Sequence, residues 1–185
     1  MFMSLIRGAD AQVDLAAAIS WTPRDDTAGL DPAGIATVVD QLPRTGLTFV
    51  LSEAAPAGDG VLSSHECDIP DSAKLLRVDE VCFPVGAVAH RHTHSGAGLR
   101  HLVRGALRIA AEGHTQIVSE GDSWFEPITS PVRAVALQGI GVTSFVRAMV
   151  IPASFAGKST FALVDPADAA LPRLQVTHRH IDLPL

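Results

Sequence analysis

The chain has 185 residues, of which 47% are hydrophobic and 18% are charged. This balance is that of a globular protein, and the length favours one domain with appendages over two independent domains. The net charge of −6 disfavours nucleic acid and anionic membranes as partners, because binding phosphates requires an excess of Lys and Arg. A pocket with a local cation could still bind a small neutral or anionic molecule.

The first residues do not predict a leader or a membrane segment. Arg7, Asp10 and Asp14 interrupt them before an apolar stretch of signal-peptide length develops, and no segment approaches the ~20 apolar residues of a membrane span. We therefore expect a cytoplasmic protein. Cys67 and Cys82 are too few for a disulfide framework, and we expect both to be free thiols.

Two segments near the N-terminus predict short helices, over residues 9–19 and 31–42. The second would begin with Asp31 as its N-cap and Pro32 at its first helical position. We therefore expect residues 1–71 to form a partly helical N-terminal arm that also contains the first strands.

From Leu47 onward, short apolar or alternating runs are separated by Gly, Pro and acidic residues. This spacing is typical of an antiparallel sandwich or barrel, and predicts an all-β core over residues 72–153. Within it, ALRIAAEGHTQIV predicts a hairpin whose turn lies near Glu112 and Gly113. We expect the tail, residues 154–185, to pack on the barrel or on a partner subunit.

The stretch AHRHTHSGAGLRHLVRG contains three histidines at alternate positions. Successive side chains of a strand point to opposite faces, so His90, His92 and His94 should share one face. Neutral imidazoles two residues apart can converge on one cation, and they suit Zn, Fe, Cu and Ni. The alternation thus permits a metal site, although most such sites need further ligands.

The spacing of Gly86, His92, His94 and Gly105 resembles the first motif of the cupin superfamily, G-x5-H-x-H-x3-4-E-x6-G. EGDSWFEPITSPVRAVA is similar to its second motif, with a Gly and a Pro separated by five residues. The resemblance covers about residues 72–153. It implies a cupin-type jelly-roll barrel, also called a double-stranded β-helix, and favours a homodimer.

Two positions depart from the family pattern. In metal-bearing members the ligands are the two histidines of the first motif, its glutamate, and the histidine of the second motif. Here Gly98 stands at the glutamate position and Val132 at the second-motif histidine position. The resemblance therefore leaves His92 and His94 as metal ligands with two family ligands missing.

Glu126 could complete a set of two histidines and one carboxylate with His92 and His94. It could equally be an acid at the rim of the barrel. Two pairs of side chains alternate in this strand, Trp124 with Glu126 and Ser123 with Phe125. The sequence does not determine which pair faces the barrel interior.

Arg100 lies two residues after Gly98, so the two should share a face. If Arg100 points inward, its guanidinium would bind a ligand carboxylate; if outward, its stem would lie along apolar surface. His90 would contact the ligand from the wall or act as a third metal ligand. We expect His178 and His180, in the tail, to be solvated histidines of an edge strand.

Two functions fit these residues. In a metal-dependent enzyme, His92 and His94, with Glu126, would hold Fe, Mn, Ni or Zn beside a small oxygenated substrate. The family includes dioxygenases, decarboxylases, isomerases and epimerases, and an open coordination site favours a dioxygenase. The alternative is a metal-free barrel that binds a small molecule as a sensor or carrier, which Gly98 and Val132 favour. No residue is assigned a catalytic role.

Overall fold

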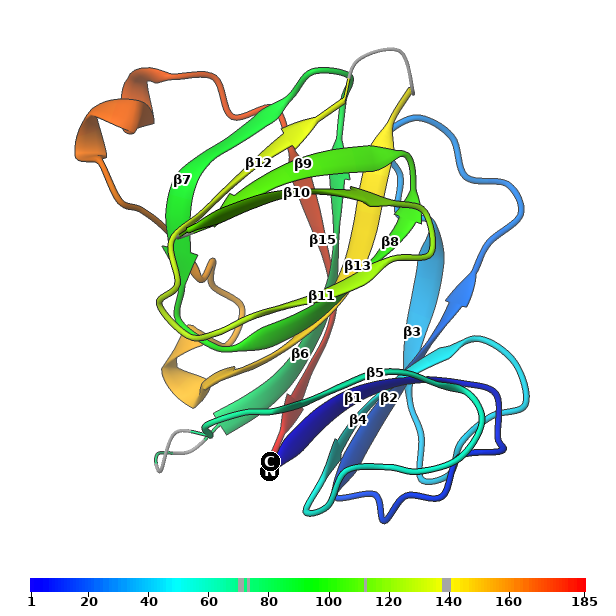
Figure 1. Ribbon diagram of the computed structural model, residues 1–185. Coiled ribbons are helices and arrows are strands. Elements are labelled where there is room, and N and C mark those ends of the chain that lie inside the picture. Colours follow the sequence, from blue (N-terminus) through cyan, green and yellow to red (C-terminus); the bar gives the residue numbers. More distant parts are fainter. Residues whose placement is uncertain (70–71, 73, 112, 138–140) are drawn as a thin grey trace.

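The computed structural model describes residues 1–69, 72, 74–111, 113–137 and 141–185, shown in Figure 1. These residues form three antiparallel sheets of five strands each, with two short 3-10 helices, η1 (Ala153–Phe155) and η2 (Pro166–Ala170). The prediction of an all-β protein is confirmed. No helix in the described part of the chain is long and apolar enough to cross a membrane.

The strands divide among an N-terminal, a central and an outer sheet. The N-terminal sheet has the order β3 (Gly34–Val38), β2 (Ala17–Pro23), β4 (Leu47–Ser52), β1 (Phe2–Arg7) and β5 (Val61–Glu66). The central sheet has the order β11 (Ser123–Glu126), β8 (Gly98–Arg104), β13 (Thr143–Pro152), β6 (Lys74–Phe83) and β15 (Val176–Pro184). The outer sheet has the order β10 (His114–Ser119), β9 (Ala106–Ala111), β12 (Val132–Ala136), β7 (Val88–His94) and β14 (Phe161–Leu163).

The central sheet is covered on both faces. On one face, side chains such as Leu76 and Val146 pack with Phe49 of the N-terminal sheet. On the other, Phe145 packs with Ile109 of the outer sheet, and these two sheets form the barrel. Consequently β6 and β13 are buried along almost their whole length. Any charge in these strands must therefore be paired inside the protein.

The prediction of two helices in the N-terminal arm is wrong. Ala17–Pro23 is a strand paired with β4, and Gly34–Val38 is a strand paired with β2. Ile35, Thr37 and Val38 are β-branched, which favours a strand, and the pairing outweighs the weak helix signals of the Asp-Pro start. The arm is therefore a sheet, and its side chains form about half of the core between the N-terminal and central sheets.

No helix begins at Asp31, because the backbone of this region forms hydrogen bonds with side chains of the central sheet. Ala33 N–H, which an Asp31 cap would satisfy, donates instead to the buried Glu80 Oε1 at 2.7 Å. His178 Nε2 donates to the carbonyl oxygen of Leu30 at 2.7 Å, and Arg104 Nη2 to that of Gly29 at 2.9 Å. These hydrogen bonds attach the loop between β2 and β3 to the barrel.

The C-terminal strand β15 pairs with β6 of the same chain. Arg77, whose side chain is 2% exposed, donates from Nε and Nη2 to the two carboxylate oxygens of Asp182 at 2.6 and 2.8 Å. His178 and His180 are not solvated as expected. The His178 side chain contacts Leu30 in the loop between β2 and β3, and the His180 side chain lies beside Glu80. The three-part division of the chain stays a prediction, and its boundary residue 71 lies outside the described residues.

The hairpin predicted around residue 112 is confirmed by the antiparallel pairing of β9 with β10, although Glu112 itself lies outside the described residues.

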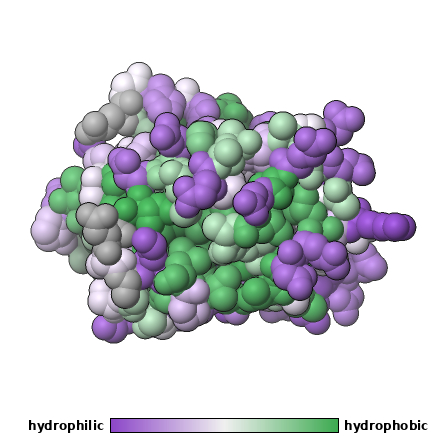
Figure 2. Space-filling model, turned by 90° about the horizontal axis from the view of Figure 1, so that it is seen from below, coloured by the Kyte–Doolittle hydropathy of each residue, from purple (hydrophilic) through white to green (hydrophobic). Residues whose placement is uncertain are grey.

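Both chain ends lie at the lower end of the molecule in Figure 1. Seen from that end, apolar side chains occupy the middle of the surface and hydrophilic ones surround them (Figure 2). The cavity of the barrel lies between the central and outer sheets.

The Arg77–Asp182 pair makes a prediction about stability. Burial opposes ionisation of Asp182, but hydrogen bonds from Arg77 and Gly157 hold its pKa below the ordinary value. Asp182→Asn should lower the free energy of unfolding by about 3 kcal/mol at pH 7, because it leaves Arg77 buried without its counter-charge. The wild-type advantage is present above the unfolded pKa of ~3.9 and is lost as the pH falls through the lower folded pKa.

Urea denaturation of wild type and variant at neutral and acid pH would measure this difference. The control is Asp59→Asn, which removes an exposed carboxyl from a loop of the N-terminal sheet. Equal losses of stability in the two variants would contradict a specific role for the pair.

Candidate functional site

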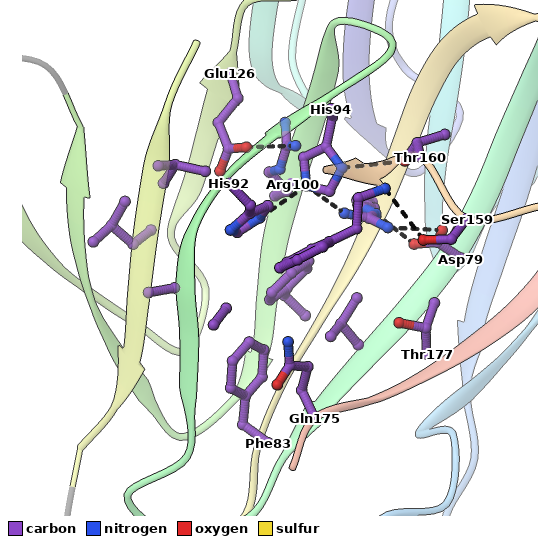
Figure 3. A pocket seen from close by; sticks show the side chains of 18 of the residues that line it. Asp79, Phe83, His92, His94, Arg100, Glu126, Ser159, Thr160, Gln175 and Thr177 are labelled. Atoms are coloured by element: carbon purple, nitrogen blue, oxygen red, sulfur yellow. Dashed lines mark hydrogen bonds and ion pairs between the residues drawn. The ribbon is translucent and has the colours of Figure 1, made fainter. Parts of the chain in front are cut away.

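A cavity of about 390 Å³ lies between the central and outer sheets. Figure 3 shows His92, His94, Arg100 and Glu126 gathered at one end of it, with Phe83 and Gln175 at the other. Apolar side chains from both sheets form much of the wall: Val81, Phe83, Ala89, Ile109, Trp124, Val132, Ala134 and Phe145. The cavity therefore has a polar end and an apolar end.

The histidine strand β7 contains a bulge that changes its alternation. Val132 of β12 pairs with His92, but Ala134 pairs with Ala89, so three steps along β7 match two along β12. Ala89, His92 and His94 line the cavity as a result, whereas His90 is not among its lining residues. The expectation that all three histidines share one face is therefore wrong for His90, whose Nε2 donates instead to the carbonyl oxygen of Pro172 at 3.3 Å.

The neighbours of His92 and His94 assign their tautomers. His92 Nδ1 lies 2.7 Å from the carbonyl oxygen of His90 and must carry a proton, because a carbonyl only accepts. Arg147 Nη1 only donates, so His94 Nε2, 3.1 Å away, accepts, and the His94 proton is on Nδ1, facing Thr160 Oγ1 at 3.1 Å. Two unprotonated Nε2 atoms then face each other at 3.2 Å.

Burial keeps both imidazoles neutral. Desolvation lowers the pKa of His92 to about 4, with smaller contributions from the Arg147 and Arg100 cations. The pKa of His94 lies well below its ordinary value because of burial and then the same two arginines. Near pH 7 the pair therefore brings no charge to the cavity. His92 Nε2 keeps its lone pair, whereas the lone pair of His94 Nε2 accepts from Arg147.

Arg100 and Glu126 both point into the cavity, which decides between the orientations that the sequence left open. Arg100 is 1% exposed, and burial lowers its pKa to about 10. Its Nη2 lies 2.6 Å from Glu126 Oε2, and Trp124 Nε1 donates to Glu126 Oε1 at 2.9 Å. Both oxygens of Glu126 are thus engaged by neighbouring donors.

The glutamate position of the family motif is sterically closed. A Cβ at Gly98 would lie 2.6 Å from Met149 Cγ, 2.8 Å from the Ala148 carbonyl oxygen and 3.0 Å from Arg100 Nη1. Arg100 Nη1 also donates to the Gly98 carbonyl oxygen at 2.5 Å. Gly98 is therefore a point of close packing around Arg100, and no larger side chain fits there without a shift of its neighbours.

Arg147 and Asp79 belong to the site, but the sequence reasoning missed them. Arg147 of β13 donates from Nε and Nη2 to the two oxygens of Asp79 of β6, at 2.6 and 3.0 Å. The signal was a lone charge within an otherwise apolar strand, TSFVRAMVIP, opposite the charged residues in KLLRVDEVCF. In strands buried on both faces, such charges are expected to pair.

These residues do not complete a metal centre. The two Nε2 atoms could share a cation, but no group of three or more His, Cys, Asp and Glu side chains that could hold a metal occurs among the described residues. Glu126, the expected third ligand, is bound by Arg100 and Trp124. The guanidinium of Arg147 beside His94 would also repel a metal cation.

The sequence profile described as "Cupin domain" matches residues 79–136. None of the curated proteins matches the chain. Solved structures with a similar arrangement include an RmlC-like cupin from Shewanella frigidimarina NCIMB 400, with 18% identity over 47% of this chain and 83% of that one, at a TM-score of 0.37.

Two enzymes are also among these structures. The DMSP lyase DddQ from Ruegeria pomeroyi DSS-3 shares 17% identity over 49% of this chain and 44% of its own, at a TM-score of 0.41. The polyketide cyclase RemF from Streptomyces resistomycificus shares 20% identity over 55% and 72%, at a TM-score of 0.39. At such values the likeness carries no information about activity.

The buried histidines make a prediction about pH. His92 titrates near 6.5 in the unfolded chain and near 4 in the fold, so between these values the unfolded chain binds more protons. Stability should therefore fall as the pH decreases from 6.5 to 4, by about 3 kcal/mol for His92 alone, and below pH 4 His92 should cause no further loss.

His92→Gln should flatten this slope in urea denaturation curves recorded across the same pH range. The control, His114→Gln at an exposed position of β10, should leave the slope as in wild type. A His92→Gln slope that matches the wild-type slope would contradict the assignment of a buried neutral imidazole.

Proposed function

We propose that this chain is a cupin that binds a small organic anion in its barrel without a resident metal. The supporting observation is the charge of the cavity wall. Among the described residues, five arginines line it against two carboxylates, and a third carboxylate, Asp182, pairs with Arg77 from outside the lining. Five cations against three anions leave an excess of two positive charges, and both lining histidines are neutral. A wall with excess cationic charge attracts an anion and opposes a metal cation.

The division of the cavity into two ends supports a ligand with two kinds of surface. The apolar wall, with Phe83, Trp124 and Phe145, can take a ring or a branched aliphatic body. At the polar end, His92 Nε2 presents a hydrogen-bond acceptor, and the Arg100–Glu126 pair presents both donors and acceptors. A cavity of this size accommodates a molecule of one ring with a short carboxylate chain.

In this proposal the cavity binds its ligand without transforming it, and each polar residue contributes through its position. Arg147, fixed by Asp79, orients His94, and the His90 carbonyl orients His92. Rigid, already paired groups lose little entropy when a ligand arrives. A sensor or carrier of a small carboxylate is the function that this arrangement supports best.

A metal-dependent enzyme, such as a dioxygenase, is the second candidate. The observation in its favour is the 3.2 Å separation of the two unprotonated Nε2 atoms, which suits a cation held between them. Against it stand the engaged oxygens of Glu126 and the neighbouring Arg147. Metal content distinguishes the two candidates.

Protein purified without an affinity tag should contain less than about a tenth of an equivalent of Fe, Mn, Ni or Zn by elemental analysis, because two ligands beside a guanidinium hold these ions weakly. His92→Ala and His94→Ala should not change this content. Stoichiometric metal that either substitution removes would overturn the metal-free proposal in favour of the second candidate.

Phenylpropionate should bind at least tenfold more tightly than its uncharged amide, because the cavity wall is cationic. Fluorescence of Trp124, which lines the cavity, and titration calorimetry would both report binding. Ala134→Leu should abolish it by filling the cavity, whereas Ala162→Leu, at an exposed position of β14, should not. Equal affinity for acid and amide would contradict an anion site.

A further inference from the structure

The buried arginines of the cavity are already neutralised. Each has a carboxylate within ion-pair distance, in the pairs Arg77–Asp182, Arg100–Glu126 and Arg147–Asp79, all at 2.6 Å. A ligand carboxylate would have to compete with these partners. A ligand carboxylate therefore needs an unpaired cation elsewhere in the wall.

Arg173 is such a cation. It lies in the exposed segment between η2 and β15 and lines the cavity. Its Cζ atom stands 4.0 Å from the centre of the Phe161 ring, and within the described residues it has no hydrogen-bond or ion-pair partner. Stacking uses the face of the guanidinium and leaves the N–H groups around its edge free for a carboxylate.

Phe161 fixes Arg173 in place. The His92 ring stacks on Phe161 with centroids 4.0 Å apart and planes at 17°, so His92 and Arg173 must occupy opposite faces of that ring. The preceding residue, Pro172, accepts a hydrogen bond from His90. A cation held by stacking on this pair of rings is oriented before the ligand arrives, which favours bidentate binding.

Gln175, two residues further on, provides a second and independent observation. Its Oε1 atom is buried and has no hydrogen-bond partner among the described atoms, and the side chain lies beside Phe83 at the apolar end (Figure 3). A buried acceptor without a donor is unfavourable, and a ligand hydroxyl would satisfy it. The same short segment thus presents a free cation and a free acceptor to one cavity.

We propose that residues 172–175 select the ligand, and that the ligand is a carboxylate with a hydroxyl at the far end of an apolar body, as in a hydroxyaryl alkanoate. Arg173 binds the carboxylate near solvent, and Gln175 Oε1 accepts from the hydroxyl beside Phe83. This assignment rests on the proposed function of the cavity. It places charge recognition in the C-terminal segment and not at Arg100.

Three probes test the assignment: para-hydroxyphenylpropionate, its amide, and phenylpropionate without the hydroxyl. Wild type should bind the first roughly tenfold more tightly than the amide, and about fivefold more tightly than phenylpropionate. Arg173→Gln should remove the preference for the acid over the amide. Gln175→Met should remove the preference for the hydroxyl and keep the preference for charge.

Arg108→Gln, at an exposed position of β9, is the matched control for the loss of one positive charge and should bind all three probes as wild type does. Arg173 is exposed, and thermal unfolding of its variant would verify that the fold is intact. If Arg173→Gln keeps the preference for the acid, the assignment is overturned while the anion cavity stands. If wild type binds none of the probes, the proposed function fails and the assignment with it.

Discussion

The ion pair between Asp79 and Arg147 is the interaction on which the cavity depends. Both residues lie in strands covered on two faces, where an isolated charge would be very costly, so each requires the other. Arg147 has one further N–H group for His94, which sets the tautomer of that ring. The orientation of the His94 ring follows from this bidentate contact, whereas burial is the main reason that both imidazoles are uncharged.

The pair of Gly98 and Glu126 explains how a carboxylate can persist in such a barrel without serving as a ligand. The two residues lie opposite each other in the β8–β11 register, so Glu126 reaches the cavity from the neighbouring strand. Met149, the Ala148 carbonyl group and Arg100 together occupy the space that a larger residue at 98 would need. Glu126 then neutralises Arg100, and a carboxylate already paired with a guanidinium and an indole N–H is a weaker ligand for a metal cation.

The sequence predicted the barrel well, because glycines in turns and apolar runs of strand length are local features. Gly105, for example, has a φ of 81°, which other residues rarely adopt. Its position in the sequence fixed the register of the motif. The orientation of Arg100 and Glu126 could not be read from alternation, since two strands had to be placed against each other first. His90 was misplaced because a bulge in β7 depends on its pairing with β12.

The helices of the arm failed for a related reason. Local propensity around Asp31 was weak, and the partners that determined the backbone there, Glu80 and His178, lie far away in the chain. Arg147 was missed because its significance depends on a partner strand that the sequence did not place beside it. Contacts between distant segments decided each of these positions.

The alternation of β6 links the arm to the cavity. Asp79 faces the cavity and binds Arg147, while the next residue, Glu80, faces the opposite side and binds the loop at Ala33. The N-terminal sheet excludes water from that second face, and it is this exclusion that keeps β6 in a medium of low polarity. Since ion pairs and imidazole pKa values both depend on such a medium, the N-terminal sheet is part of what gives the cavity its electrostatic character.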